Sequence, residues 1–327
     1  MFITARKLPE ELLHYYALQR RSALGAKNHD KLRRLERGVE GERVYDLILA
    51  EAGHGNLYIF RDLYLMIEGS VTQYDTLIVS ESGIIVNEIK NFTGDYQVEG
   101  SMWTGSRGTP LPDDPLSQLR RAVGKLMNMQ RAAGFNFEVS GKLIFPNESF
   151  RLFAKDDQVW NQVVLRADLR RYFNGFYNEY SGEGASELAD IIERHIVQNP
   201  YFKHRVEFDS VRHGLYCGGC GSFQLEKQQF HLLCMTCGSR ESNETHLVRA
   251  MSDFKYLFGD LAMTSRRLME FTGEVVNYRT VYDTLKKHCY IDKKGNHTVY
   301  IFKYYDFDEA MQKSTSKKRY KDYIIKF

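Results

Sequence analysis

The spacing of apolar residues changes period along the chain, from helical to extended and back again. Between Tyr15 and Ala50 apolar side chains recur at helical spacing, which predicts a helix with one buried stripe. The next forty residues contain short segments rich in β-branched and aromatic residues with turn residues between them, which predict consecutive strands. These three segments are 57–65, 74–80 and 83–91.

A second helix and more strands complete one predicted α/β domain. The further elements are a strand at 96–99, a helix at 116–133 and buried strands at 141–146 and 162–165. The order helix, three strands, helix, strand favours an α/β fold with a mixed sheet. We place this domain in residues 1–205, with Asn199 and Pro200 near its end.

The remainder of the chain divides into two further predicted domains. From His213 to Arg240 the chain is rich in Cys, Gly and Gln and poor in aliphatic residues, which predicts a small domain, placed in residues 206–243, that folds around something other than a hydrophobic core. Helical periodicity returns in residues 244–327, with helices predicted at 264–273 and 277–287 and a hairpin at 289–302. The expected C-terminal domain is therefore mainly helical.

Composition and charge exclude broad classes but identify no partner. The 327 residues are 43% hydrophobic, and no run approaches the roughly 18 apolar residues that a spanning helix needs, so we expect no membrane association. The N-terminus lacks an apolar signal core, which favours a cytoplasmic location. Forty-five basic residues oppose 42 acidic ones, while the tail 311–327 is basic and could be a solvated end or an arm that contacts phosphates.

Two Cys-x-x-Cys pairs form the strongest local motif. The pairs are Cys217 with Cys220 and Cys234 with Cys237, and a glycine follows each pair. Each turn lets two thiolates reach one tetrahedral ion, and the alternating segment between the pairs predicts a β-hairpin. The motif predicts a structural zinc site in a zinc ribbon; the alternative is a redox pair or buried free thiols.

Two acids and a lysine lie on the predicted strands and suggest a second metal site. Glu88 and Lys90 are two apart, so they project from one face of their strand, and Asp75 lies on the neighbouring strand. Carboxylates of this kind suit Mg²⁺ or Mn²⁺, and a lysine beside them could orient or deprotonate an attacking water. The alternative is a solvated salt bridge. Because the strand is strongly apolar, buried charges at its end need a reason.

A longer series of motifs resembles the nuclease-related domain, NERD. The series comprises Gly38-Val39-Glu40-Gly41-Glu42, Gln73-Tyr74-Asp75, Gly83, Val86-Asn87-Glu88-Ile89-Lys90-Asn91, Gly94, Trp103 and Pro115-Leu116-Ser117-Gln118. The resemblance covers approximately residues 35–150 and implies a restriction-endonuclease-like fold of the PD-(D/E)xK nuclease superfamily. Tyr74 departs from the family, which usually has a small aliphatic residue there, and no proline precedes Asp75.

The resemblance also implies roles for individual residues. Asp75 and Glu88 would hold the divalent metal, and Lys90 would be the catalytic lysine. Glu42 would be the acid contributed by the first helix. Gln118 and Gln73 match glutamines near the family's site, although Glu42 could equally be a solvent-facing helix residue and Gln118 a residue of the first helical turn.

The C-terminal elements resemble a winged helix-turn-helix. In that arrangement Tyr278, Arg279 and Thr280 would face the major groove of DNA, and Lys293 and Lys294 on the hairpin would reach phosphates. A helical domain for protein interaction or dimerisation is the alternative.

Together these features predict a metal-dependent nuclease with catalytic Mg²⁺ or Mn²⁺ and structural Zn²⁺. We expect DNA rather than RNA as its substrate and leave a homodimer open. The alternative is a catalytically silent scaffold or regulator that binds nucleic acid through a nuclease fold.

Overall fold

The computed structural model describes residues 1–105, 108–134, 136–203, 206–294, 297–313 and 321–325. The chain forms two compact units, here called unit 1 (Met1–Leu8 and Arg33–Tyr201) and unit 2 (Pro9–Leu32 and Phe202–Phe327). Residues 9–32 therefore group with the C-terminal part of the chain, although they precede the first strand. Whether the chain also divides at 205 and 243 into independently folding domains stays a prediction.

The predicted helix from Tyr15 to Ala50 is in fact two helices, α1 (Glu10–Arg21) and α2 (Ala26–Ala52). Ser22 ends α1 in extended backbone, and its N–H bonds to the Leu18 carbonyl. The apolar spacing alone did not reveal this break because no proline separates the two helices. Gly53 ends α2 with a left-handed φ of 84°, which glycine adopts without steric cost.

Unit 1 is built on one six-stranded mixed sheet. Its strands are β1 (Tyr58–Ile67), β2 (Ser70–Ser80), β3 (Gly83–Ile89), β6 (Glu138–Phe145), β8 (Val163–Leu165) and β9 (Ile196–Val197). They lie in the order β8-β6-β3-β2-β1-β9; β2 pairs antiparallel with β1 and β3, while β6 is parallel to β3 and β8. Strand β3 lies inside the sheet with six of its seven residues buried, which explains its nearly unbroken apolar sequence.

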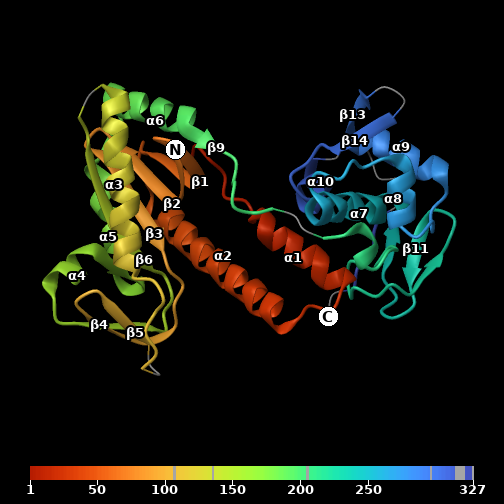
Figure 1. Ribbon diagram of the computed structural model, residues 1–327, viewed down its shortest axis with the longest axis horizontal. Helices are drawn as coiled ribbons and strands as arrows, with labels where there is room; N and C mark the ends of the chain where they lie inside the picture. The colour runs from red at the N-terminus through yellow and green to blue at the C-terminus, as the bar shows by residue number, and fades with distance from the viewer. Residues whose placement is uncertain (106–107, 135, 204–205, 295–296, 314–320, 326–327) are drawn as a thin grey trace. The chain divides into compact units, whose positions relative to one another are not determined.

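Helices cover both faces of this sheet (Figure 1). On one face α3 (Pro115–Ala133) and α6 (Glu183–His195) contribute to a core that includes Leu77 and Leu143. On the other face α2 and α5 (Leu169–Asn174) pack over Ile78 and Ile144. The mixed α/β architecture predicted from the sequence is confirmed.

A smaller three-stranded sheet stands beside the main one in unit 1. Its order is β5-β4-β7, formed by Met102–Gly105, Gly94–Glu99 and Phe150–Ala154, and the helix α4 (Asp157–Gln162) follows it. Trp103 on β5 is 1% exposed and belongs to the core.

Unit 2 combines two small sheets, β10-β11-β12 and β13-β14, with helices around α7. Its helices after α1 are α7 (Asn243–Phe258), α8 (Ser265–Phe271), α9 (Tyr278–His288) and α10 (Phe307–Lys313). Its strands are β10 (Leu225–Lys227), β11 (His231–Cys234), β12 (Arg240–Ser242), β13 (Cys289–Lys294) and β14 (His297–Phe302). Thirteen of the 16 residues of α7 are buried, so this helix forms the centre of the unit's core. The predicted helical C-terminal part is confirmed.

Candidate active site and metal centre

Four acidic residues of unit 1 lie near one another where the pairing of β1 with β2 is interrupted. They are Glu42 of α2, Asp62 of β1, Asp75 of β2 and Glu88 of β3. Arg61 pairs with Thr76 and Leu63 with Tyr74, but Asp62 and Asp75 between them are unpaired, and Asp62 has a φ of 47°. On β2, Leu77 and Tyr74 belong to the same core although they are three residues apart, so the strand's alternation shifts by one residue here. This local irregularity in β1 and β2 lies beside the end of β3.

Asp75, Glu88 and Lys90 lie close to one another, as their positions on neighbouring strands predicted. Asp75 Oδ2 accepts a hydrogen bond of 2.7 Å from the backbone N–H of Ile89. Lys90 Nζ donates to Glu88 Oε1 at 2.7 Å, and the Lys90 N–H bonds to the Ile144 carbonyl of β6. The Asp75 side chain thus continues the β2–β3 pairing in place of a backbone carbonyl. The backbone of Lys90 is thus hydrogen-bonded to the sheet. The side chain of Glu88 is 5% exposed.

Electrostatics in this cluster favour the binding of a cation. Burial, followed by the negative charge of Asp75, raises the pKa of Glu88 to about 7 despite the opposing effect of Lys90. Burial opposes the charge of Lys90 as well, but Glu88 and Asp75 outweigh it and raise the pKa of Lys90 above its ordinary value. A hard divalent cation would relieve the repulsion between the two carboxylates, and carboxylate oxygens are the ligands that Mg²⁺ and Mn²⁺ prefer. The residues present therefore fit such an ion.

Arg6 is the residue that sequence reasoning missed. Its Nη1 donates to Glu42 Oε2 at 2.9 Å, and its Nε donates to Asp46 Oδ2 at 2.8 Å. Its Nη2 donates to the carbonyl of Asp75 at 3.2 Å and to the hydroxyl of Thr76 at 3.1 Å. Its side chain is 10% exposed. The Arg6 guanidinium therefore links α2 to the interrupted part of β2 through hydrogen bonds. No motif in the sequence indicated this role for Arg6.

Glu42 lies at this site but has a partner of its own in Arg6. Burial, followed by the charge of Asp75, raises the pKa of Glu42 to about 8, because together these effects outweigh the attraction of Arg6. The helix glutamate is thus largely shielded from solvent and close to Asp75, unlike the solvent-facing residue that we considered as an alternative. Asp62 is a further acid near Asp75 that the sequence did not single out, and burial raises its pKa too.

The two predicted glutamines occupy different positions. Gln73 Nε2 donates to Asp62 Oδ1 at 3.2 Å, so Gln73 reaches the acidic cluster through Asp62. Gln118 is exposed one turn into α3, and its N–H bonds to the carbonyl of Asp114, the N-cap residue. The start of α3 is near the site, since Asp113 contributes to raising the pKa of Lys90. The structure thus links Gln73 to the cluster, while Gln118 shows the first-turn backbone bond that we considered as its alternative explanation.

Gly41 permits α2 to approach the loop after β3. A Cβ at Gly41 would lie 2.5 Å from Cβ of Asn91, whose side chain is held by hydrogen bonds to Arg37 and Asn147. We expect Gly41→Ala to lower the free energy of unfolding by about 1–2 kcal/mol, because overpacking outweighs the helix preference of alanine. Urea unfolding would measure this difference.

Gly38 on the same helix provides the matched control. A Cβ there meets nothing within 4 Å, so Gly38→Ala should stabilise the protein by about 0.5–1 kcal/mol. Equal stabilisation by both substitutions would contradict the close approach of Gly41 and Asn91.

The four cysteines of unit 2 converge as their spacing predicted. Within the described ranges, Cys217, Cys220, Cys234 and Cys237 are the one group of three or more potential metal ligands whose donor atoms all lie within 4.8 Å of one another. The Sγ atoms of Cys217 and Cys237 are 3.5 Å apart, as are those of Cys220 and Cys234. Tetrahedral zinc with Zn–S bonds of about 2.3 Å requires S···S distances of roughly 3.8 Å. The cluster could therefore hold a zinc ion.

The surrounding backbone resembles two matching metal knuckles. Gly221 and Gly238, which follow the two pairs, both have a φ of 75°, and their N–H groups bond to the carbonyls of Cys217 and Cys234. The strands β10 and β11 form the predicted antiparallel hairpin between the pairs. Hydrogen bonding with Ser239 lowers the pKa of Cys237 to about 6, whereas burial raises the pKa of Cys217 and of Cys220 above the ordinary value of a thiol.

Two further contacts brace this cluster. Glu241, 1% exposed, accepts a hydrogen bond from the Gly218 N–H at 2.7 Å and pairs with the guanidinium of Arg249 on α7. At the C-terminal end, Tyr323 and Arg240 exchange backbone hydrogen bonds of 2.8 Å, and the Ile325 N–H donates to Ser239 Oγ. The end of the basic tail thus packs on β12, whereas residues 314–320, which include Lys317, lie outside the described residues.

The predicted nucleic-acid contacts of α9 differ from one another. Tyr278 is 56% exposed, and the Arg279 side chain, 93% exposed, lies 4.0 Å from Asp283. The Thr280 hydroxyl bonds to Oδ1 of Asn277, the N-cap residue of α9. Lys293 is exposed on β13; the side chain of Lys294 lies outside the described residues.

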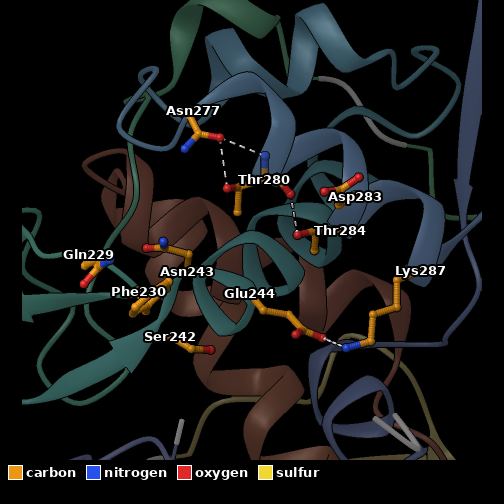
Figure 2. A pocket seen from close by; sticks show the side chains of 10 residues that line it. All are labelled: Gln229, Phe230, Ser242, Asn243, Glu244, Asn277, Thr280, Asp283, Thr284 and Lys287. Carbon is orange, nitrogen blue, oxygen red and sulfur yellow. Dashed lines mark hydrogen bonds and ion pairs between the residues drawn. The ribbon is translucent and has the colours of Figure 1, made fainter. Parts of the chain in front are cut away.

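A cavity of about 380 Å³ lies beside α9 in unit 2 (Figure 2). Thr280, Asp283 and Lys287 of α9 face the start of α7 across it, where Glu244 pairs with Lys287. Phe230 and Gln229 from the loop between β10 and β11 close another side. Thr280, which is partly buried, therefore lines a pocket that is open to solvent.

Unit 1 is thus a mixed α/β domain that carries the buried Glu88, the partly buried Asp75 and Lys90 at one point of its sheet. The family model of the nuclease-related domain, NERD, matches residues 37–146, about a third of the chain. This segment is a nuclease-related domain and contains all the acids and the lysine predicted for the site, whereas Arg6 lies outside it. No curated protein and no solved structure matches the chain. Within the described part of the chain, no helix has the length and apolar character needed to cross a membrane.

Proposed function

We propose that the chain is a metal-dependent nuclease that hydrolyses phosphodiester bonds in nucleic acid. The observation that carries the proposal is the buried Glu88 beside the partly buried Asp75, with Lys90 bonded to the glutamate at 2.7 Å, inside a nuclease-related domain. Like charges held away from water in this way are costly in a protein unless a cation joins them. The proposed ion is Mg²⁺ or Mn²⁺.

Each residue of the site has a proposed task. Asp75 and Glu88 would hold the cation, which when bound supplies Lewis-acid stabilisation of the negative charge on the phosphate. Lys90 would orient the attacking water, because its raised pKa keeps it charged and its bond to Glu88 fixes its position. Arg6 would position Glu42 and the backbone of Asp75. Asp62, held by Gln73, would add to the local negative potential.

The test is cleavage of plasmid, linear and single-stranded substrates with Mg²⁺ or Mn²⁺ added. Products with defined ends from DNA would support the proposal, and a matching RNA strand left uncut would support the preference for DNA over RNA. Failure to cleave any of these substrates, with a folded and zinc-loaded protein, would overturn it.

One observation favours the alternative, a silent scaffold that binds nucleic acid. Glu42 and Asp46 are already neutralised by Arg6, so the chain provides an internal cation beside the site. Calorimetric titration with Mn²⁺ separates the two functions: binding beyond the stoichiometric zinc supports the nuclease, and its absence supports the scaffold.

Metal binding at Glu88 should depend on pH in a direction that its pKa determines. The ordinary pKa of glutamate is 4.5, and burial, followed by the charge of Asp75, raises the pKa of Glu88 to about 7 against the opposing effect of Lys90. Between these pH values the metal-free folded protein binds more protons than the unfolded chain, so its stability falls as the pH rises through this window. Mn²⁺ must displace the proton, and its affinity should therefore rise about tenfold per pH unit from 5.5 to 7.

Calorimetry at pH 5.5, 6.5 and 7.5 would measure this trend. Glu88→Gln is the control, since it should weaken binding and flatten the pH dependence. An affinity for Mn²⁺ that is the same at all three values would contradict the assignment of Glu88 as a ligand.

A further inference from the structure

The outer face of α9 carries a column of aromatic and basic side chains. Tyr278 and Tyr282 are one helical turn apart, and their rings are nearly parallel, with an interplanar angle of 13° and centroids 6.0 Å apart. Lys286, a further turn along, places its Nζ 4.5 Å from the centroid of the Tyr282 ring. Over half of the Tyr278 surface remains exposed, so the column ends in a ring that solvent can reach.

The hairpin that follows α9 repeats this combination. Tyr290 on β13 is 63% exposed, and Nζ of Lys303 lies 5.6 Å from the centroid of its ring. Ile301, which pairs with Tyr290 across the hairpin, is 52% exposed. Two exposed tyrosines, each on an element that also carries a cationic side chain, therefore stand on consecutive elements of unit 2.

The polar groups at the start of α9 are poorly placed to read base edges in a duplex. The Thr280 hydroxyl is engaged by the helix cap, and Arg279 has Asp283 one turn away. Asp283 would also repel phosphates that flank a major groove. What α9 offers outward is the face of a ring, and ring faces recognise the faces of bases, which a duplex covers with neighbouring base pairs.

We propose that α9 and the β13–β14 hairpin bind unpaired nucleobases by stacking, with Lys286 and Lys303 attracting the phosphates of the strand. Tyr278 is the principal stacking residue and Tyr290 a second one. The gap of 6.0 Å between Tyr278 and Tyr282 is less than the roughly 7 Å that an inserted base requires, so the base stacks on the outer side of Tyr278. The proposal rests on nucleic acid being the partner of the proposed nuclease and names single-stranded segments as the form that unit 2 selects.

Fluorescence anisotropy of labelled oligonucleotides tests the proposal on the full chain, in buffer without divalent metal or chelator. The probes are a 15-nucleotide oligo-dT, the matching oligo-U and a 15-base-pair duplex hairpin. We expect each single strand to bind at least tenfold more tightly than the duplex, and comparison of the two strands separates DNA from RNA as the source. Equal or tighter binding of the duplex would overturn the proposal.

Substitutions at the exposed ring identify the stacking contact. Tyr278→Ala should weaken binding of the single strand about tenfold, whereas Tyr278→Phe keeps the ring and should bind as the unchanged protein does. Tyr177→Ala, at a tyrosine of unit 1 that is 86% exposed, is the matched control and should have no effect. Unchanged binding by Tyr278→Ala, or loss of binding by Tyr278→Phe, would overturn the assignment.

This inference and the nuclease proposal can fail separately. Binding of single strands that persists without any cleavage on addition of Mg²⁺ supports the surface and overturns the nuclease. Cleavage that persists while the tyrosine substitutions leave binding unchanged supports the nuclease and overturns the surface.

Discussion

Asp75→Asn and Lys90→Met are each expected to reduce Mg²⁺-dependent cleavage by about 1,000-fold, through different losses. Asn retains an oxygen that can accept the hydrogen bond from the Ile89 N–H, so the strand end should keep its structure while a charged ligand is lost. Lys90→Met removes the group proposed to orient the water but leaves both carboxylates. The first substitution should therefore weaken Mn²⁺ binding, and the second should slow turnover while the ion still binds.

Cleavage assays together with Mn²⁺ calorimetry would distinguish these effects. Glu40→Gln is the control, because Glu40 lies on the same helix as Glu42 but pairs with Arg43 on the exposed surface. It should leave both measurements unchanged. If the Asp75 and Lys90 variants keep the activity of the unchanged protein, the proposed site is wrong.

Loss of the four-cysteine site should have the largest effect on stability. Cys234→Ser is expected to reduce zinc from one ion per chain to none and to lower the Tm of unit 2 by roughly 10 °C, given a loss of about 4 kcal/mol. The cause is the small local core: the sheet of β10, β11 and β12 has three or four residues per strand and cannot replace the metal with apolar contacts.

Elemental analysis, thermal unfolding and limited proteolysis would measure this result. The segment that ends at Ile325 bonds to Ser239 and Arg240 beside the cysteines, so protease should reach it sooner once zinc is lost. Cys289→Ser is the control: this cysteine is buried next to Met251, outside the cluster, and the variant should keep its zinc. A zinc content unchanged in Cys234→Ser would exclude the four-cysteine site.

Local sequence contained enough information for most elements of unit 1. The strands β1, β2 and β3 and the helix α3 lie close to their predicted positions because turn residues and a change of apolar period mark their ends. Three short strands, β5, β7 and β9, were not predicted because they have only two to five residues each. β7 and β9 pair with strands distant in sequence, whereas β5 forms a tight hairpin with β4. The break between α1 and α2 was also not predicted, because the residues on both sides of it favour helix.

The candidate sites show the same division. The cysteine cluster was predictable because ligand spacing within each Cys-x-x-Cys turn is a local property. Asp75, Glu88 and Lys90 were predictable as a set because strand periodicity and a family resemblance both pointed to them. Arg6 was not, because its partners Glu42 and Thr76 lie 36 and 70 residues away and surface arginines are common in any sequence.

The sequence by itself determined the chemistry of this protein: a nuclease-related segment with two acids and a lysine, and four cysteines spaced for one ion. Only the tertiary structure decided which groups meet. It placed Arg6 in an ion pair with Glu42 and Asp62 beside Asp75 at an interrupted strand pair. It also placed Thr280 in the lining of a pocket, while the side chain of Tyr278 remains exposed to solvent. The physical reason is that residue type and local period specify donors, acceptors and faces, whereas charge pairing and burial depend on contacts between distant parts of the chain.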